Sequence, residues 1–491
     1  MVEEQRKAGP RQWASLVVLM LPVLLVSVNN TALSFALPAI SQGLHPTASQ
    51  LLWIVDVYPL ILAALLIPMG SLGDRMGRRK MLMIGSTGFG LVSLFAAFAP
   101  SAEWLLAARV GIAVFGSMLL PTTLSLLRTV FRDDRQRSLA IAIWTAGFSA
   151  GAALGPIAGG FLLNHFWWGS VFLLAVPVLL AFLVAAPLIL PESKDPHPGP
   201  VDPLSIVLAV LTMAPVVYGI KSLATGGSVL HGVLFMAVGA LCGLLFARQQ
   251  VAKDYPMLDL RFFRSPRFSG GLSVNMMSNV ALFGFLFFFT QYLQLVNGTD
   301  PMTSGLLMVP GLVLSILAGL GAERIARLVG IRTAVVLGLL LVAAGFFIVA
   351  FTVMSAGTGL ATTLSTDLVV SSVPEAKAGA ASAVSETGYE VGAVLGTAVL
   401  GGLTTAFYQA HLELPAAVSA DSAQIAHETL GGALDVAADS PAGSVIADAA
   451  VAAFSSGMQW TALIGGVLVA VVALVLARVL RADRRVRRVQ G

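Results

Sequence analysis

Fourteen apolar segments, each long enough to cross the hydrocarbon core of a bilayer, follow one another along the chain. A span of about 20 apolar residues crosses that core as a helix, so the pattern predicts fourteen transmembrane helices. The sequence therefore predicts an all-α membrane protein. We place the spans near residues 13–36, 51–72, 81–99, 104–127, 138–163, 170–190, 204–222, 229–248, 268–296, 302–322, 331–351, 353–372, 379–405 and 458–480.

Lysine and arginine are distributed unevenly among the segments that join these spans. Of the 29 such residues, all can be placed on one side of the membrane except Lys221 and Arg109. We expect Lys221 on the outer side, and Arg109 lies within a span. Because loops rich in Lys and Arg stay in the cytoplasm, we expect a multi-pass protein of the bacterial inner (cytoplasmic) membrane with both termini in the cytoplasm.

Charge and composition also bear on the class of protein. The net charge of +4 does not predict nucleic-acid binding, since the basic residues fit anchors at the anionic inner leaflet. A membrane-embedded enzyme needs a nucleophile and base, or a metal site, near the interface. The sequence offers neither pattern, so we expect no enzyme, no cofactor and no metal. Transport of a small molecule by a monomer surrounded by membrane lipids is the interpretation that we adopt.

Two stretches depart from the simple pattern. Residues 331–372 must hold two spans and a turn, yet no polar turn signal stands between Gly345 and Thr358. We interpret this as residues absent near 350. Residues 408–457 hold six acidic residues and no Lys or Arg, which predicts an extracellular loop with short amphipathic pieces such as Val445–Phe454. That loop either covers an outward opening or is a solvated connector.

Glycine and charge are dense between the second and third spans, at residues 70–80. Glycines let helix ends approach closely, and Asp74 can pair with a neighbouring arginine or with a helix N-terminus. We predict a gating latch that holds one conformation until helices separate; a merely basic inner loop is the alternative. The latch residues are Gly70, Gly73, Asp74, Arg75, Gly77, Arg78 and Arg79, with Lys80 at the end of the loop.

A run of small residues in the fifth span allows close helix packing, and its proline permits bending. The run contains Gly151, Gly155, Pro156, Gly159 and Gly160. It resembles the antiporter motif of the major facilitator superfamily. In the same order along the chain, the 70–80 loop resembles that family's signature loop, and the intramembrane arginine, residue 109, resembles its arginine motif.

The number of spans indicates which branch of this superfamily the chain resembles. Together with Leu52-Trp-Ile-Val-Asp56-Val-Tyr58 in the second span, fourteen spans resemble the fourteen-span drug:proton antiporters, especially the bacterial multidrug exporters of quaternary ammonium compounds and dyes. The resemblance covers essentially the whole length. It implies the major facilitator fold, with six-helix bundles at 1–195 and 263–491 and an inserted two-helix hairpin at 196–262.

The resemblance implies a function as well. It implies a proton-coupled multidrug efflux antiporter, of the kind that confers antibiotic resistance, which exports lipophilic and cationic compounds by alternating access. Its partners would be small lipophilic cations and protons. Two alternatives stay open, namely an exporter of a lipid or natural product on the same fold and a transport-dead membrane sensor that binds ligand.

Ionisable groups inside the spans are costly, so each is a functional candidate. Glu386 and Glu390 share one face of span 13, roughly 10 and 16 Å from its inner end at 1.5 Å per residue. Two such carboxyls should not both be ionised when the site is empty, so at least one is expected to hold a proton. Glu390 is our first candidate for proton or cation binding, and Glu386 is equally a candidate for gating. Asp56 either pairs with Arg109, at similar depth, or takes a direct part in coupling.

One position departs from the family pattern. The first span of the family has a carboxylate where this chain has Asn29, and an amide cannot lose a proton. Coupling then proceeds without that site, or the asparagine is a substitution that fixes a protonated-like state.

We also expect a substrate cavity with aromatic faces for cation–π contacts, worth about 0.5–2 kcal/mol each. Packing against lipid or helices is the alternative for each ring. The candidates are Trp53, Tyr58, Trp144, Phe148, Phe287, Gln291 and Tyr389.

Overall fold

The structure is a computed structural model that describes residues 8–131, 133–194, 202–224, 228–253, 256, 258–373, 378–415 and 418–490. Within these ranges the chain forms helices and no strands, which confirms the predicted all-α class. By length and composition, eleven of the described helical segments can cross a membrane.

The first bundle buries a single apolar core, to which Leu19, Phe89 and Phe182 contribute from three different helices. Two further helices, α9 (Pro203–Ala224) and α10 (Val229–Ala252), pack on each other as a hairpin. The helices of the first bundle are α1 (Pro10–Leu44), α2 (Ala48–Met76), α3 (Arg78–Ala97), α4 (Ala102–Gly116), α5 (Leu119–Val130), α6 (Asp134–His165), α7 (Ser170–Leu173) and α8 (Ala175–Ile189).

The second bundle has its own core, which includes Phe285, Leu339 and Met354. The domain boundaries at 195 and 262 remain a proposal. The helices of the second bundle are η1 (Leu260–Arg264), α11 (Pro266–Gln291), η2 (Tyr292–Val296), α12 (Pro301–Val329), α13 (Ile331–Phe347), α14 (Phe351–Ser371), α15 (Ala378–Gly396), η4 (Thr397–Gly401), α16 (Gly402–His411), α17 (Ala420–Glu428), α18 (Leu430–Ala438) and α19 (Gly443–Gln490).

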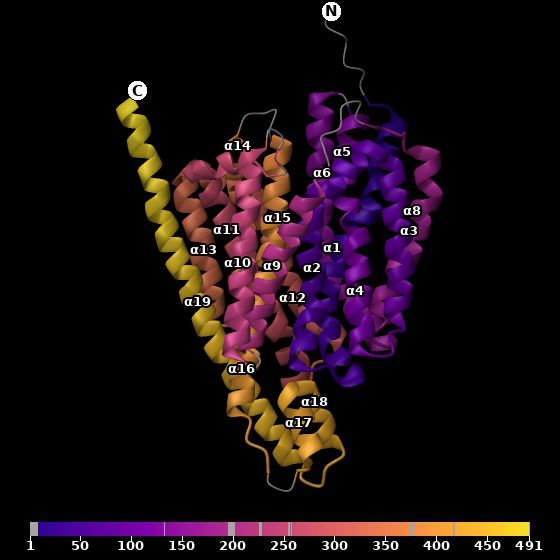
Figure 1. The fold of residues 1–491 in the computed structure, drawn as a ribbon, viewed down its shortest axis with the longest axis vertical. Helices are drawn as coiled ribbons and strands as arrows, with labels where there is room; N and C mark the ends of the chain where they lie inside the picture. Colours follow the sequence, from indigo (N-terminus) through magenta and orange to yellow (C-terminus); the bar gives the residue numbers. More distant parts are fainter. Residues whose placement is uncertain are drawn as a thin grey trace, which may run out of the picture.

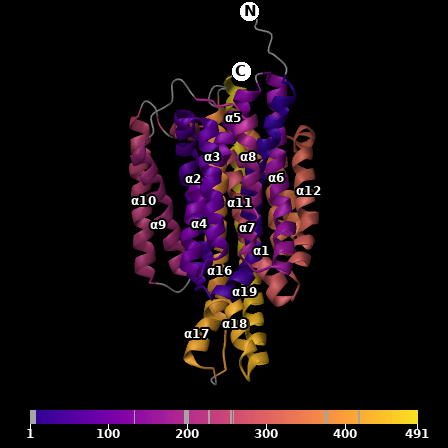
Figure 2. The ribbon, with the colours of Figure 1, turned by 90° about the vertical axis from the view of Figure 1, so that its right-hand side faces the viewer.

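The predicted spans lie on these helices, with the fourth divided between α4 and α5 and the sixth between α7 and α8. Figure 1 shows the start of α1 and the end of α19 at one end of the molecule, which we call the terminal end. The helices α17 and α18 lie at the opposite end, which we call the cap end. In the second view α9 and α10 lie at one side and α12 at the other (Figure 2).

Local sequence signals set where several helices begin. Thr47 accepts a hydrogen bond from the backbone N–H of Gln50, and the Gln50 side chain accepts one from the backbone of Thr47. This reciprocal pair satisfies two N–H groups that the start of α2 leaves without helical partners. Asp300 caps α12 in a similar position, directly before Pro301, whose missing N–H costs nothing at the first helical residue.

The two spans predicted for residues 331–372 are α13 and α14, joined by a tight turn at residues 348–350. Val349 adopts the left-handed conformation, with φ of 48°. The helices meet closely there, since a Cβ on Gly345 would lie 2.5 Å from the Cβ of Met354. The turn joins the two helices directly, with a β-branched residue in the left-handed conformation, and the absence of residues near 350 stays a prediction.

The described part of segment 408–457 contains two short helices, in line with the short pieces predicted for it, but the piece named in that prediction is wrong. Helix α16 continues span 13 to His411, α17 and α18 follow, and α19 begins at Gly443, well before residue 458. Val445–Phe454 is therefore the start of α19 and not a separate amphipathic piece. Residues 445–454 are rich in alanine and contain no proline, so the helix continues without interruption into the apolar span. We call α17 and α18 the cap.

Candidate functional site

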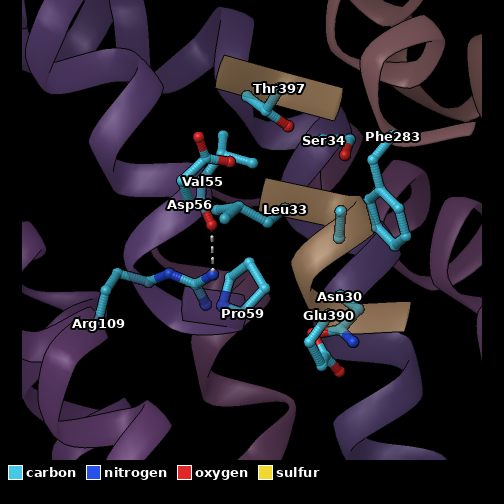
Figure 3. A pocket seen from close by; sticks show the side chains of 11 residues that line it. Asn30, Leu33, Ser34, Val55, Asp56, Pro59, Arg109, Phe283, Glu390 and Thr397 are labelled. Carbon is cyan, nitrogen blue, oxygen red and sulfur yellow. Dashed lines mark hydrogen bonds between the residues drawn. The ribbon is translucent and has the colours of Figure 1, made fainter. Parts of the chain in front are cut away.

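A small cavity lies where the two bundles meet, and both contribute to its wall (Figure 3). Its volume is about 20 Å³, enough for about one water molecule. Drug-sized ligands need roughly 300 Å³ or more, so this conformation is closed around the site. The lining residues are Asn30, Leu33, Ser34, Val55, Asp56, Pro59, Arg109, Phe283, Glu390, Ala393 and Thr397.

Glu390 lines this cavity from α15 and is fully buried. Neither of its carboxyl oxygens has a hydrogen-bond partner among the described residues. A buried carboxylate without a partner costs several kcal/mol, whereas the neutral acid avoids most of that cost. The surroundings of Glu390 therefore fit a carboxyl that keeps its proton until a cation arrives or the cavity opens. Glu386, one turn earlier, is only partly buried and does not line the cavity.

Asp56 pairs with Lys221 of α9 and not with Arg109. The Lys221 Nζ lies 2.9 Å from Asp56 Oδ2, and both side chains are buried. The salt bridge expected between Asp56 and Arg109 is therefore wrong, and Lys221 is buried instead of lying in a solvent-exposed loop. Helix α9 runs almost one turn beyond Lys221, to Ala224, and this holds the lysine inside the helix layer. The ammonium also lies over the ring of Trp53, 4.1 Å from its centroid.

Arg109, from α4, binds the backbone of α2 instead. Its Nε donates to the carbonyl of Ile54 over 3.0 Å and its Nη2 to that of Val55 over 3.5 Å. The Val55 carbonyl is available as an acceptor because Pro59, four residues later, has no N–H to donate to it. The guanidinium also lies 4.6 Å from the centroid of the Tyr58 ring. Figure 3 shows Arg109 and Phe283 on different sides of the cavity.

Aromatic rings connect the two bundles next to the cavity. Phe148 of α6 meets Tyr389 of α15 edge to face, with centroids 6.1 Å apart. Trp144 stacks on Phe148 at 6.4 Å, and Phe283 meets Tyr389 at 5.8 Å. Four rings thus run from α6 through α15 to α11. None of the seven predicted cavity residues is among those that line the central cavity. Two of them, Phe287 and Gln291, line a second cavity beneath the cap, with Tyr408 and Glu428.

The glycine run of span 5 packs α6 against two helices. Gly151 faces α1, where a Cβ would lie 2.8 Å from that of Ser27, and Gly160 faces α12, where a Cβ would lie 2.7 Å from Met302 Cα. Gly155 and Gly159 also face α1, and Pro156 meets Gly305 of α12. At the cap end the Asn164 amide donates to Asp300 over 2.7 Å. Hydrogen bonds from Thr303 and Asn164 hold the pKa of the Asp300 carboxyl below its ordinary value.

The cap docks on α1 and α2 where these helices reach the cap end. The hydroxyls of Ser41 and Thr429 are 2.8 Å apart, and the backbone N–H of Ala48 donates to Glu428 over 2.7 Å. His45 lies 3.6 Å from Asp435; partial burial raises the pKa of Asp435, and His45 opposes that shift. Because the cap follows span 13 in the chain, these contacts join the two bundles. With the α6–α12 contacts, they close the protein at the cap end.

The predicted latch residues make their contacts within the first bundle. The Asp74 carboxylate accepts from Arg78 at 2.8 Å, and Arg78 donates to Thr129 of α5 at 2.5 Å. The backbone N–H groups of Arg79 and Lys80 donate to Glu192, after α8. The remaining members are Gly70 and Gly73, which face α5, Gly77, which turns the chain with φ of 112°, and Arg75, which is exposed. A gating role for this cluster remains a prediction.

Several lining residues were not predicted. Asn30, and not Asn29, lines the cavity from α1, and Ser34 lies one turn further along. Thr397 enters through η4, where a π-helical turn interrupts span 13. No sequence pattern that we used marks such a turn. Lys221, in contrast, could have been identified, because it is an ionisable residue within an apolar span, as Asp56 and Arg109 are.

Known proteins resemble this chain over nearly its whole length. Residues 19–397 match the family described as Major Facilitator Superfamily. The chain is 50% identical to "Multidrug efflux pump LfrA" of Mycolicibacterium smegmatis, over 95% of this chain and 96% of that protein. It is 36% identical to "Methyl viologen resistance protein SmvA" of Salmonella typhimurium, over 90% of this chain and 93% of that protein.

Solved structures share the fold at low sequence identity. A bacterial homologue of the human lysosomal transporter Spinster, in an inward-facing and unoccupied conformation, superposes with a TM-score of 0.66 at 18% identity, over 97% of this chain and 99% of that one. The nucleoside transporter NupG gives a TM-score of 0.59 at 12% identity, over 96% of this chain and 99% of that one.

Proposed function

The chain belongs to the major facilitator superfamily, and on that premise we propose that it exports lipophilic cations in exchange for protons, with Glu390 as the coupling carboxyl. It is a multi-pass membrane transporter whose relatives include a multidrug efflux pump and a methyl viologen resistance protein. One observation carries the finer proposal: Glu390 is fully buried, without a hydrogen-bond partner among the described residues, at a cavity shared by both bundles.

The chemistry of exchange follows from that placement. With its proton, Glu390 is neutral and can stay in the closed cavity. Without it, the carboxylate needs a counter-charge, which a cationic substrate can supply. Proton and cation therefore compete for one group. A proton arriving from outside would displace the exported cation, and loss of that proton to the cytoplasm would prepare the next cycle.

Orientation and oligomeric state belong to the same proposal. The latch loop is rich in Arg and Lys, and the connection between α16 and α19 is acidic. By the positive-inside rule, the terminal end faces the cytoplasm of a bacterial inner membrane and the cap faces outward. Closure at the cap end then corresponds to a conformation shut toward the outside, from which substrate would enter by separation of the helices at the terminal end. We also propose that the protein acts as a monomer.

Substrate cations are proposed partly from the relatives. One relative carries methyl viologen, an organic dication, in its name, and the aromatic rings around Glu390 offer faces for cation–π contacts. A lipid or natural-product exporter and a transport-dead sensor remain the alternatives.

Everted membrane vesicles containing the protein test the proposal. Respiration acidifies the vesicle lumen, and addition of ethidium or methyl viologen is expected to release protons from it, seen as recovery of a quenched amine dye. Vesicles from cells that lack the protein are the control. Cation binding without proton movement would favour the sensor, and transport of a neutral lipid alone would favour the lipid exporter. Either result contradicts cation:proton exchange.

A further inference from the structure

The inserted hairpin reaches the candidate site at Lys221. Helix α9 contacts α2 of the first bundle and η4 and α16 of the second. Its Val217 packs with Leu60, Val394 and Ala398 in one apolar cluster that joins all three parts of the protein. One turn beyond Val217, the Lys221 ammonium lies beside Asp56, which lines the central cavity.

The surroundings of that ammonium are those of a recognition site for an organic cation. The ring of Trp53 lies 4.1 Å away, and the Asp56 carboxylate lies 2.9 Å away. An aromatic face combined with a buried carboxylate is the chemistry that binds alkylammonium and aromatic cations. Trp53 and Asp56 lie about one turn apart on α2 and are presented together. In this conformation the cation they hold belongs to the protein itself.

The position of Lys221 beside Asp56 changes which acidic groups at the cavity are available to a substrate cation. Asp56 faces Lys221 from α9, Arg109 lines the same cavity from α4, and Glu390 lines it from α15. The Asp56–Lys221 pair is neutral overall, and no cationic side chain among the described residues lies within ion-pair distance of Glu390. Of the two acids that line the cavity, one is therefore already neutralised by a built-in cation.

We propose that Trp53 and Asp56 form a second binding site for an organic ammonium, and that Lys221 is its tethered occupant. By filling this site, the hairpin keeps substrate cations from Asp56 and leaves Glu390 as the single acidic group open to them. Lys221 is thus a specificity-determining residue that favours single positive charges over double ones. This inference rests on the proposed function, since it assumes that cations enter the cavity.

The test is binding of cations to the purified protein at pH 8, measured as dissociation constants for the monocation tetraphenylphosphonium and the dication methyl viologen. Lys221→Met keeps most of the side-chain length and removes the charge. It is expected to bind methyl viologen about tenfold more tightly than the parent, the gain of one additional cation contact. Lys221→Arg, which keeps the charge, is expected to bind both ligands as the parent does.

Lys221→Met removes one partner of a buried ion pair, which lowers the stability of the folded protein. A second variant therefore tests whether changed binding reflects loss of stability. Lys221→Met combined with Asp56→Asn removes both charges, a change that buried pairs tolerate well. This double variant lacks the carboxylate that Lys221→Met leaves open, so the tenfold gain in methyl viologen binding is expected to disappear. A folded Lys221→Met protein with unchanged methyl viologen binding would overturn the proposal. So would a gain in methyl viologen binding that persists in the double variant, because the gain would then not depend on Asp56.

The parent protein distinguishes this inference from the proposed function. If the parent binds tetraphenylphosphonium and the Lys221 variants leave methyl viologen binding unchanged, only the inference fails. If neither the parent nor Lys221→Met binds either cation, the proposed substrate class fails, and the inference fails with it. Binding of methyl viologen by Lys221→Met alone would support the second site and contradict the role given to Glu390.

Discussion

Glu390→Gln is expected to abolish proton-driven efflux while leaving the protein folded. Glutamine has nearly the shape of the protonated acid that the buried, partnerless position fits, so packing of α15 against the cavity should persist. The amide cannot release or accept the proton, and it offers a cation only a dipole. We expect ethidium efflux driven by a pH gradient in proteoliposomes to fall about 100-fold or more, the scale on which a lost proton-transfer group acts.

Glu413→Gln is the matched control for that variant. Glu413 is exposed on the segment that follows α16, so the same chemical change there should leave efflux at the parent level. Efflux by Glu390→Gln that equals the parent across pH 6–8 would remove Glu390 from the mechanism. Loss of efflux in both variants would show that the assay reports general damage instead of coupling.

A disulfide between the cap and α1 is expected to block transport reversibly. The hydroxyls of Ser41 and Thr429 are 2.8 Å apart and join α1 to the start of α18, so cysteines at both positions lie within reach of a bond. Alternating access requires the cap end to open, and the bond would hold it closed. Oxidised Ser41→Cys/Thr429→Cys protein should lose nearly all ethidium efflux, and a reductant should restore it.

The chain favours this experiment, because Cys242 is its only cysteine and can be replaced by alanine beforehand. Each single cysteine variant in that background is the control for loss of a hydroxyl, including the hydrogen bond that Thr429 accepts from the backbone of Gly432 at the start of α18. Full transport by the oxidised double variant, with the disulfide verified by mass spectrometry, would contradict the view that cap and α1 separate during the cycle.

The fold was largely predictable from sequence because bilayer crossing leaves few alternatives. Long apolar segments must form helices, and prolines at residues 10, 266 and 301 stand where helices begin. The prediction was weaker where a helix leaves the apolar region. Val445–Phe454 carries too few signals to distinguish a separate amphipathic helix from the first turns of α19.

The candidate site was only partly predictable, for two physical reasons. An ionisable residue inside an apolar span costs free energy, so its presence there predicts a function. Asp56, Arg109 and Glu390 were predicted on this ground, and all three line the cavity. Which charge pairs with which depends on how helices rotate and approach, and the sequence does not specify that. In the structure Asp56 pairs with Lys221 of the inserted hairpin, whereas Arg109 donates a hydrogen bond to the Val55 carbonyl. Pro59 leaves that carbonyl without its helical partner. Polar residues such as Ser34 and Thr397 carry no comparable cost and gave no signal.

Proton release on ligand binding tests the role of Glu390 most directly. Purified protein in weakly buffered detergent near neutral pH is mixed with tetraphenylphosphonium, and a pH indicator reports the protons set free. The parent should release about one proton for each cation bound, and Glu390→Gln should release none. Equal release by the two proteins, or saturable binding to the parent with no proton set free, would contradict exchange at this carboxyl.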